Sequence, residues 1–306
     1  MALTGVLRAG FVQIRVLDMA EALTHYVDRI GLDLVGKERD GRVYLKGCEE
    51  FDHHSIVLRE ADDAGMDVMG FKVAAKTDLA AYEKRIKAFG LRVRRIAAGS
   101  QPGLGQCLDF TIPSGHRIEL YAEMAPAAAV PYTENPDVWR NEPRGMRALS
   151  FDHCLLYGPE IPAVTRFFTD VLDFSLAEAV QTPEGPIAAF LTSSNKAHEV
   201  AFVQHEESDK FHHASFRLDS WHDVGHAADL IACYQIERDI GPTRHGITRG
   251  QTIYFFDPSG NRNEVFCGGY TYFPDHPTRV CTPDPLGKGI FYYEQELNER
   301  FLGVVT

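Results

Sequence analysis

The chain has 306 residues, of which 44% are hydrophobic, so it can bury one large core or two medium ones, and we expect two domains. Its 43 acidic residues outnumber its 31 basic residues, giving a formal net charge of −12. This charge argues against nucleic acid or an anionic membrane as the main partner. We therefore expect the partner to be a small molecule or another protein.

No targeting or membrane signal is recognisable. No apolar run approaches the roughly 20 residues that a membrane-spanning helix needs, and residues 1–10 lack the basic-then-apolar layout of a signal peptide. These features predict a cytoplasmic protein. The cysteines are scattered without a C-x-x-C pair, which favours buried free thiols over a zinc site or a disulfide framework. They are Cys48, Cys107, Cys154, Cys233, Cys267 and Cys281.

The first 60 residues follow a β-α-β-β-β order. Residues 10–17 predict a strand, Asp18 is suited to cap the helix that follows, and Gly31 is suited to end it. Three further strands are predicted at residues 32–36, 42–46 and 55–59. The same order recurs with a strand at 70–74, a helix at 78–89, and strands at 91–96, 106–112 and 117–122.

The second half of the chain repeats the first. A proline-rich stretch from 124 to 150 breaks the rhythm and is typical of a connection. After it, Phe151-Asp-His-Cys-Leu-Leu-Tyr157 resembles the segment that begins at Phe11, 140 residues earlier. Pro258-Ser-Gly-Asn-Arg-Asn-Glu-Val-Phe266 resembles the segment that begins at Pro113, 145 residues earlier. The sequence therefore predicts four βαβββ modules, two in each half.

These modules predict an α+β protein in which each pair curls its strands into an open, barrel-like sheet around a cavity. The predicted domains are a metal-free N-terminal pair at 1–123, a linker at 124–148, a catalytic pair at 149–268 and a tail at 269–306. Within the tail, residues 290–301 predict a helix whose apolar side chains pack on the core or close the mouth of the cavity.

The two copies differ at positions that carry chemistry. The aligned pairs are His153 with Gln13, His213 with Val68, and Glu264 with Glu119. Two imidazoles and a carboxylate on separate strands are what a three-ligand divalent metal site requires, with open positions opposite. For any single histidine, a hydrogen-bonded core or surface position is the more common role. Because both histidines occur only in the second half, we expect a metal site in that half and no metal site in the first half.

Other polar residues of the second half lie near this predicted site. His198 corresponds to His54 of the first half, so a purely structural role is open for it. His245 and Tyr254 flank the strand pair that carries Glu264, and such residues can exchange protons or donate to an oxyanion. Four other histidines of this half are predicted to be surface or packing residues: His205, His212, His222 and His226.

The spacing His245-x₇-Ile-Tyr254-x-x-Asp-Pro-x-Gly260-x₃-Glu264 resembles the signature of the extradiol ring-cleavage dioxygenases of the vicinal oxygen chelate superfamily. Nearly the whole chain resembles the catechol 2,3-dioxygenases among them, and the segments 12–19, 41–46, 239–245 and 298–301 carry this likeness. Only the linker and residues 97–106 depart from the pattern. The fold implied is the vicinal oxygen chelate, or glyoxalase-like, fold.

The resemblance implies Fe(II), with Mn(II) as the alternative, bound by His153, His213 and Glu264. It implies that catechol or a substituted catechol is cleaved by O₂ beside its hydroxyls to a 2-hydroxymuconic semialdehyde. His198 matches the family's acid–base residue, and His245 and Tyr254 match residues that bond the substrate oxygens. Ile290 and Phe301 match apolar residues around the ring, and the family is commonly tetrameric.

Two other functions use the same fold. A glyoxalase-like or fosfomycin-resistance-like enzyme would use a metal without oxygen chemistry. A metal-free binding protein of the bleomycin-resistance kind would leave His153 and His213 without an explanation. The active metal and the response to catechol distinguish these alternatives.

Overall fold

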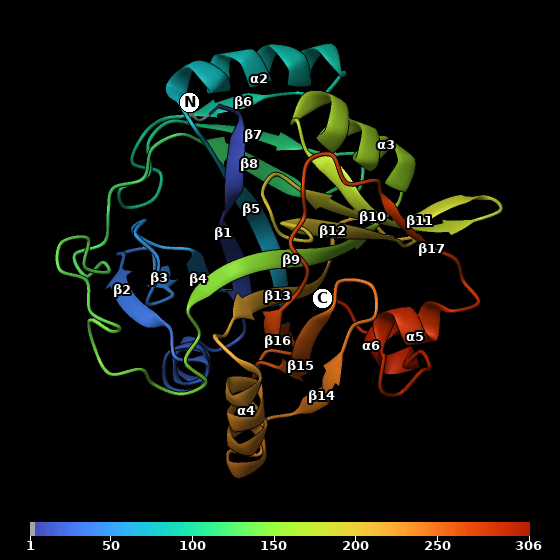
Figure 1. Ribbon diagram of the computed structural model, residues 1–306. Coiled ribbons are helices and arrows are strands. Elements are labelled where there is room, and N and C mark those ends of the chain that lie inside the picture. Colours follow the sequence, from blue (N-terminus) through green and yellow to red (C-terminus); the bar gives the residue numbers. More distant parts are fainter. Residues whose placement is uncertain (1–3) are drawn as a thin grey trace.

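The computed structural model describes residues 4–306 and contains two mixed sheets, one from each half of the chain (Figure 1). The first has the order β2-β3-β4-β1-β5-β8-β7-β6 and the second the order β14-β15-β16-β13-β9-β12-β11-β10-β17. The predicted α+β fold of four βαβββ modules is confirmed. In residues 4–306, no helix is long and apolar enough to cross a membrane.

The first half contains the two predicted modules in order. Its strands are β1 (Val6–Val16), β2 (Asp33–Lys37), β3 (Val43–Lys46), β4 (Ile56–Glu60), β5 (Gly65–Val73), β6 (Arg94–Ile96), β7 (Cys107–Thr111) and β8 (Arg117–Tyr121). Its helices are α1 (Met19–Leu23), the π-helix η1 (Thr24–Ile30) and α2 (Lys76–Ala88). The Asp18 side chain accepts a hydrogen bond from the Glu21 amide at 2.9 Å, and Gly31 ends the helix at φ 95°, as the sequence predicts.

The second half repeats this arrangement and adds a tail. Its strands are β9 (Ser150–Gly158), β10 (Ser175–Thr182), β11 (Gly185–Thr192), β12 (Val200–Gln204), β13 (Lys210–Arg217), β14 (Arg238–Arg244), β15 (Gly250–Phe256), β16 (Arg262–Gly268) and β17 (Arg279–Cys281). Its helices are α3 (Ile161–Arg166), the π-helix η2 (Phe167–Val171), α4 (Trp221–Cys233), α5 (Leu286–Ile290) and α6 (Glu299–Gly303).

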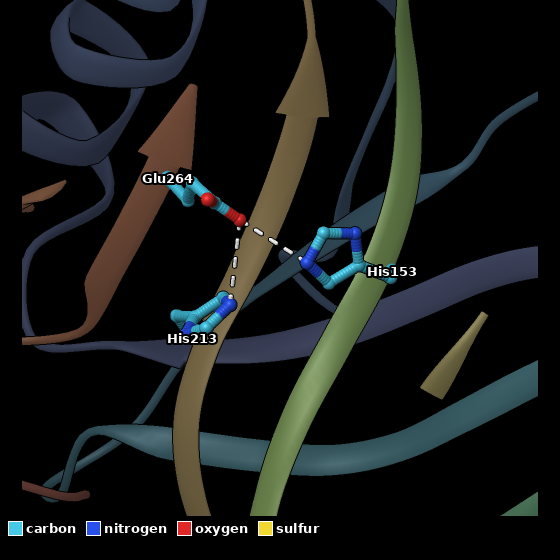
Figure 2. A group of neighbouring side chains, drawn as sticks. All are labelled: His153, His213 and Glu264. Carbon is cyan, nitrogen blue, oxygen red and sulfur yellow. Dashed lines mark ion pairs between the residues drawn. The ribbon is translucent and has the colours of Figure 1, made fainter. Parts of the chain in front are cut away.

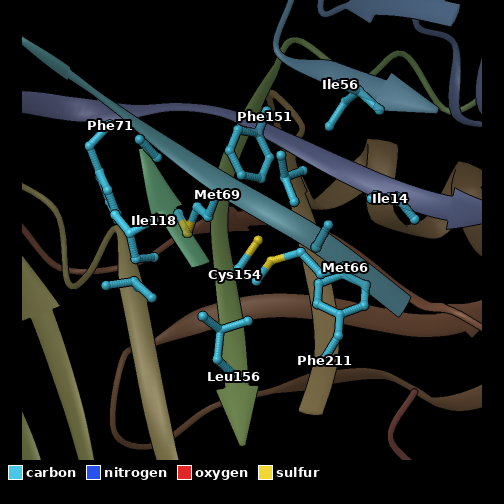
Figure 3. Close-up of a cluster of buried hydrophobic side chains, with 14 of the residues drawn as sticks. Ile14, Ile56, Met66, Met69, Phe71, Ile118, Phe151, Cys154, Leu156 and Phe211 are labelled. Atoms are coloured by element: carbon cyan, nitrogen blue, oxygen red, sulfur yellow. The ribbon is translucent and has the colours of Figure 1, made fainter. Parts of the chain in front are cut away.

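One hydrophobic core joins the two sheets. Figure 3 shows Met66 and Met69 of the first half beside Cys154 of the second, and all three side chains are buried in one cluster. Successive side chains of a strand point to opposite faces, so Cys154 and Leu156 on β9 face this shared core while Leu155 turns to the other side of the sheet. The shared core thus fixes which face of β9 is left for chemistry.

Helices from different halves also contact each other. The Tyr82 hydroxyl on α2 donates to Asp173, just after η2, at 3.0 Å. The Arg29 guanidinium on η1 lies 3.5 Å from the centre of the Tyr234 ring, which follows α4. These contacts hold the two halves in one orientation.

The predicted tail helix is wrong. Helix α5 ends at Ile290 and helix α6 begins only at Glu299, so residues 291–298 are not helical. Phe291 is extended, with φ −125°, and the Asn298 side chain accepts a hydrogen bond from the Phe301 amide, which begins a new helix. The predicted strand at 91–96 is also shorter, because β6 begins only at Arg94.

Strand register corrects one counterpart between the halves. In the first sheet Val12 pairs with Ile56, and in the second Cys154 pairs with Val200. Phe11 pairs with Gly70 across β1 and β5, as His153 pairs with Ser215 across β9 and β13. The counterpart of His153 is therefore Phe11, and the predicted match with Gln13 is wrong by two residues. A shift of two leaves each side chain on the same face, so periodicity could not reveal it.

Candidate active site

Three neighbouring strands bring together the two imidazoles and the carboxylate that the sequence singles out. Ser215 on β13 pairs with His153 of β9 on one side and with Glu264 of β16 on the other. His213 lies two residues before Ser215, on the same face. Nε2 of His153 is 3.1 Å from Oε2 of Glu264, and Nε2 of His213 is 3.5 Å from the same oxygen (Figure 2). The three donor atoms lie within 4.8 Å of one another, so they could hold a metal ion.

A β-bulge precedes each of the two histidines. Phe211 pairs with Leu156 and His213 with Leu155, so His212 is the extra residue of a bulge in β13. Likewise Ser215 pairs with His153 and Phe216 with Phe151, so Asp152 is the extra residue of a bulge in β9. A bulge re-aims its side chains, and here it lets each extra residue reach the histidine that follows it.

Asp152 orients His153. Its Oδ2 lies 2.7 Å from Nδ1 of His153, and because a carboxylate only accepts, that nitrogen carries the proton. Nε2, which faces Glu264, is the other ring nitrogen. Lys196 donates to the Asp152 carbonyl at 2.6 Å and lies 3.1 Å from its Oδ1. The sequence analysis missed the role of Lys196, although its neighbour His198 marked this loop.

His212 contacts His213 in the same way. Their Nδ1 atoms are 2.7 Å apart, and Nε2 of His212 is 2.7 Å from the Phe301 carbonyl oxygen. His212 is only 1% exposed. The prediction of a surface or packing residue therefore missed its contact with His213, and the adjacent His-His pair was the only signal in the sequence.

Glu264 is held through one oxygen and left open at the other. Its Oε1 accepts a hydrogen bond from the Thr252 hydroxyl at 2.6 Å. Within residues 4–306, no hydrogen bond of acceptable geometry reaches Oε2, although it is fully buried. A buried carboxylate oxygen without a partner is costly, so this atom fits a site for a cation.

The electrostatics also favour a cation. Burial raises the pKa of Glu264, but the neighbouring His153 and His213 outweigh burial and hold it well below its usual range. Burial lowers the pKa of His213 to about 4 despite the nearby Glu264, which keeps this imidazole neutral. Burial also lowers the pKa of His153, but Asp152 and Glu264 outweigh it and raise the value. Two carboxylates thus favour positive charge at this point, as a bound divalent metal would supply.

A cavity of about 720 Å³ opens beside these three groups. Its walls are mainly apolar and aromatic, and they include Leu155, Ile187, Phe190, Ile247, Phe266 and Leu286. His198 lines the same cavity, with its ring centre 4.2 Å from that of His153. Burial, and then the neighbouring His153, lower the pKa of His198 well below its usual range. Its Nδ1 is buried and has no hydrogen-bond partner in the described chain.

His245 and Tyr254 lie together on the same cavity. Nε2 of His245 is 2.8 Å from the Tyr254 hydroxyl, and Nδ1 of His245 contacts the Ile290 carbonyl. Since a carbonyl only accepts, Nδ1 carries the proton and Nε2 is free to accept from Tyr254. Burial, and then Glu264, raise the pKa of Tyr254 well above 10, so its hydroxyl stays protonated.

The tail supplies a further wall. Ile290 and Phe301 both line the cavity, and the Phe301 ring lies 4.8 Å from the ring of Tyr254. Phe301 is buried, while the side chain of Ile290 is partly exposed. The structure thus brings every residue that the sequence singled out in the second half to one cavity: His153, His198, His213, His245, Tyr254, Glu264, Ile290 and Phe301.

The corresponding place in the first half is filled differently. Phe11 and Val68 stand where the second half has its two histidines, and both are buried in an apolar cluster with Tyr121. Glu119 is the counterpart of Glu264, and Arg117 lies 2.8 Å from its Oε1. His54, the counterpart of His198, is buried and bonds Gln101 at 2.7 Å.

Comparison with known proteins agrees with this arrangement. Residues 66–125 match the family described as "Catechol 2,3-dioxygenase-like N-terminal domain", and residues 150–265 match "Glyoxalase/Bleomycin resistance protein/Dioxygenase superfamily". The metapyrocatechase of Pseudomonas sp. (strain CF600) is 50% identical over 304 residues, which cover 99% of each chain. The crystal structure of the 2,3-dioxygenase LapB from Pseudomonas sp. KL28 has a TM-score of 0.89 at 45% identity, covering 92% of this chain and 99% of that one.

More distant relatives share the fold. The homoprotocatechuate 2,3-dioxygenase of Arthrobacter globiformis has a TM-score of 0.88 at 23% identity and covers 100% of this chain and 93% of its own. The fold and the site thus define an extradiol dioxygenase of the vicinal oxygen chelate superfamily. Within that superfamily, the chain belongs to the metapyrocatechase family.

Proposed function

We propose that this enzyme cleaves catechol or a substituted catechol with O₂ beside the two hydroxyls, giving a 2-hydroxymuconic semialdehyde. The observation that carries the proposal is the convergence of Nε2 of His153, Nε2 of His213 and Oε2 of Glu264 at the wall of a largely apolar cavity. An aromatic ring suits such walls, while its hydroxyls need the polar groups at one end.

We further propose that the metal is Fe(II), held by these three groups. Two imidazoles and one carboxylate on one side of an ion, with open positions opposite, are typical of non-heme iron oxygenases. A bound Fe(II) would supply the point at which the two substrate oxygens and dioxygen meet and exchange electrons. Mn(II) is the alternative, because one relative, 24% identical, is a manganese-dependent 2,3-dihydroxybiphenyl 1,2-dioxygenase of Geobacillus genomosp. 3.

The residues around the cavity would handle the protons. A catechol hydroxyl that enters beside Tyr254 can displace the tyrosine from Nε2 of His245 and pass its proton to that nitrogen. His198 offers a neutral imidazole, with one N–H donor and one free nitrogen, to a reactant near His153. Ile290 and Phe301 would hold the ring and keep water from this end of the cavity.

Anaerobic reconstitution tests this function. The apoprotein is loaded separately with Fe(II), Mn(II) and Zn(II), and catechol and air are then added while oxygen uptake and the yellow semialdehyde are followed. We expect ring cleavage with Fe(II) and none with Zn(II). Activity with Zn(II) towards another substrate, without oxygen uptake, would favour the glyoxalase-like alternative. Failure to bind any of the three metals would favour the binding-protein alternative.

We also propose that the enzyme is a cytoplasmic homo-oligomer, with a tetramer expected from the resemblance described above. The predicted boundaries at residues 123, 148 and 268 likewise stay predictions. Size-exclusion chromatography with light scattering tests the oligomeric state.

Limited proteolysis tests the domain boundaries, and we expect cleavage first in the linker, where Val138 is 82% exposed.

A further inference from the structure

We propose that His212 is a positioning residue that connects the C-terminal tail to His213, so that the tail is a structural part of the metal site. This inference rests on the metal site proposed above. It concerns a residue that does not line the cavity and that has no role in the proposed reaction.

The bulge in β13 makes the connection possible. In a regular strand, residues 212 and 213 would point to opposite faces. Because His212 is the extra residue of the bulge, its ring lies beside that of His213, with ring centres 5.0 Å apart. Tyr157 stacks on the His212 ring at 4.8 Å, and Phe301 meets it edge-on at 4.7 Å. The ring of His212 is therefore fixed by packing on two sides.

The hydrogen bonds around His212 allow only one arrangement of protons. The Phe301 carbonyl can only accept, so Nε2 of His212 carries a proton. The ring is only 1% exposed, and its two nitrogens contact the Phe301 carbonyl and His213 rather than a carboxylate, so it carries a single proton, on Nε2, and its Nδ1 is bare. The bond of 2.7 Å between the two Nδ1 atoms then requires the proton on Nδ1 of His213.

The position of this proton determines which nitrogen of His213 is available at the proposed metal site. With its proton on Nδ1, His213 has a bare Nε2, and this is the nitrogen that faces Oε2 of Glu264 at 3.5 Å. The carbonyl of Phe301 thus selects, through His212, the tautomer of His213 that can bind a metal through Nε2.

The tail is held to β13 on both sides of this contact. The buried Arg262 side chain donates to the Val304 carbonyl at 2.7 Å and lies 3.4 Å from the His212 carbonyl. The backbones of Phe211 and Thr306 exchange two hydrogen bonds, at 2.8 and 3.0 Å. The position of the Phe301 carbonyl relative to His212 is therefore fixed by the docked tail.

An isosteric pair of variants separates hydrogen bonding from packing. In His212→Gln, an amide can accept from His213 and donate to the Phe301 carbonyl, whereas in His212→Met a side chain of similar size can do neither. The control is His116→Gln. His116 is fully buried and bonds the Lys210 carbonyl at the start of β13 at 3.0 Å, but it does not touch a predicted ligand.

The measurement is the affinity of each apoprotein for Co(II) and Fe(II) under anaerobic conditions, by competition with a chelator, together with the Co(II) d–d absorption spectrum. We expect His212→Met to weaken metal binding by about 10–100-fold and to alter the spectrum. His212→Gln should keep most of the affinity, and His116→Gln all of it. A second apolar variant, His212→Phe, keeps the stacking on Tyr157 and replaces His212→Met if that variant does not fold.

Several outcomes would overturn the inference. One is an apolar variant with the affinity and spectrum of the unmodified protein. Another is an equal loss in His212→Gln, His212→Met and His116→Gln, which would indicate general destabilisation. If the unmodified protein bound neither metal, the proposed function itself would fall, and this result is distinct from the other two.

Discussion

Oδ2 of Asp152 lies 2.7 Å from Nδ1 of His153, and Lys196 lies 3.1 Å from the other oxygen of the same carboxylate. The Asp152 carboxylate is buried, and it places a negative charge behind the predicted metal ligand. A carboxylate in this position fixes the imidazole tautomer and raises the basicity of the ligating nitrogen.

Asp152→Asn should therefore weaken metal binding by about 10–100-fold, because the variant keeps the shape of the side chain and loses its charge. Metal content after dialysis against a weak chelator measures the effect. Asp62→Asn, at an exposed position, is the control and should leave the metal content unchanged. Equal metal content in the two variants would contradict the role given to Asp152.

Lys196→Met should keep the metal and slow turnover. Lys196 ties the loop that carries His198 to the Asp152 carbonyl of β9, and His198 packs against His153. Loosening this loop misplaces His198, and we expect kcat to fall on the order of tenfold. Lys196→Arg should recover part of the loss. Steady-state kinetics with metal analysis of the same samples test this, and a loss of metal with unchanged kcat per metal would contradict it.

Phe11→Ala should destabilise the fold without changing the chemistry. Phe11 is fully buried in the first half, where it occupies the position that His153 has in the second. Removing a buried aromatic side chain costs about 3–5 kcal/mol of unfolding free energy. Urea unfolding measures this cost, and kcat per bound metal should stay unchanged at 25 °C. A selective loss of activity in the folded variant would show that the first half takes part in the reaction.

The stability of the protein should fall in acid partly because of His116. Burial lowers the pKa of this residue to about 4 in the folded state, against an ordinary value of 6.5. Between these values the unfolded chain takes up the proton and the folded chain does not. The stabilisation is therefore complete above about pH 6.5 and is lost as the pH falls towards 4.

His116→Gln should reduce the slope of unfolding free energy against pH in this window by up to about 1.4 kcal/mol per pH unit. Urea titrations of both proteins between pH 4 and 7.5 measure the slope. Because the other titrating groups are common to the two proteins, they cancel in the difference. An identical slope in both proteins would mean that His116 is protonated in the folded state.

Local patterns in the sequence were enough to predict the order of elements and the four modules. These follow from local physics, because caps such as Asp18, turn glycines and a period of two along a strand act over a few residues. The motif from His245 to Glu264 and its likeness to a known family identified further residues of the second half, and these residues line one cavity in the structure.

The alignment of strands that lie far apart in the sequence depends on how they pair in the folded protein. The match of His153 with Phe11 rather than Gln13 depends on the pairing of β1 with β5 and of β9 with β13, and a shift of two residues leaves the hydrophobic pattern unchanged. The bulges at Asp152 and His212 arise from the same pairing. The sequence could therefore name the three groups predicted to bind a metal. The groups that orient the histidines follow from strand register and the docked tail, which no local pattern encodes.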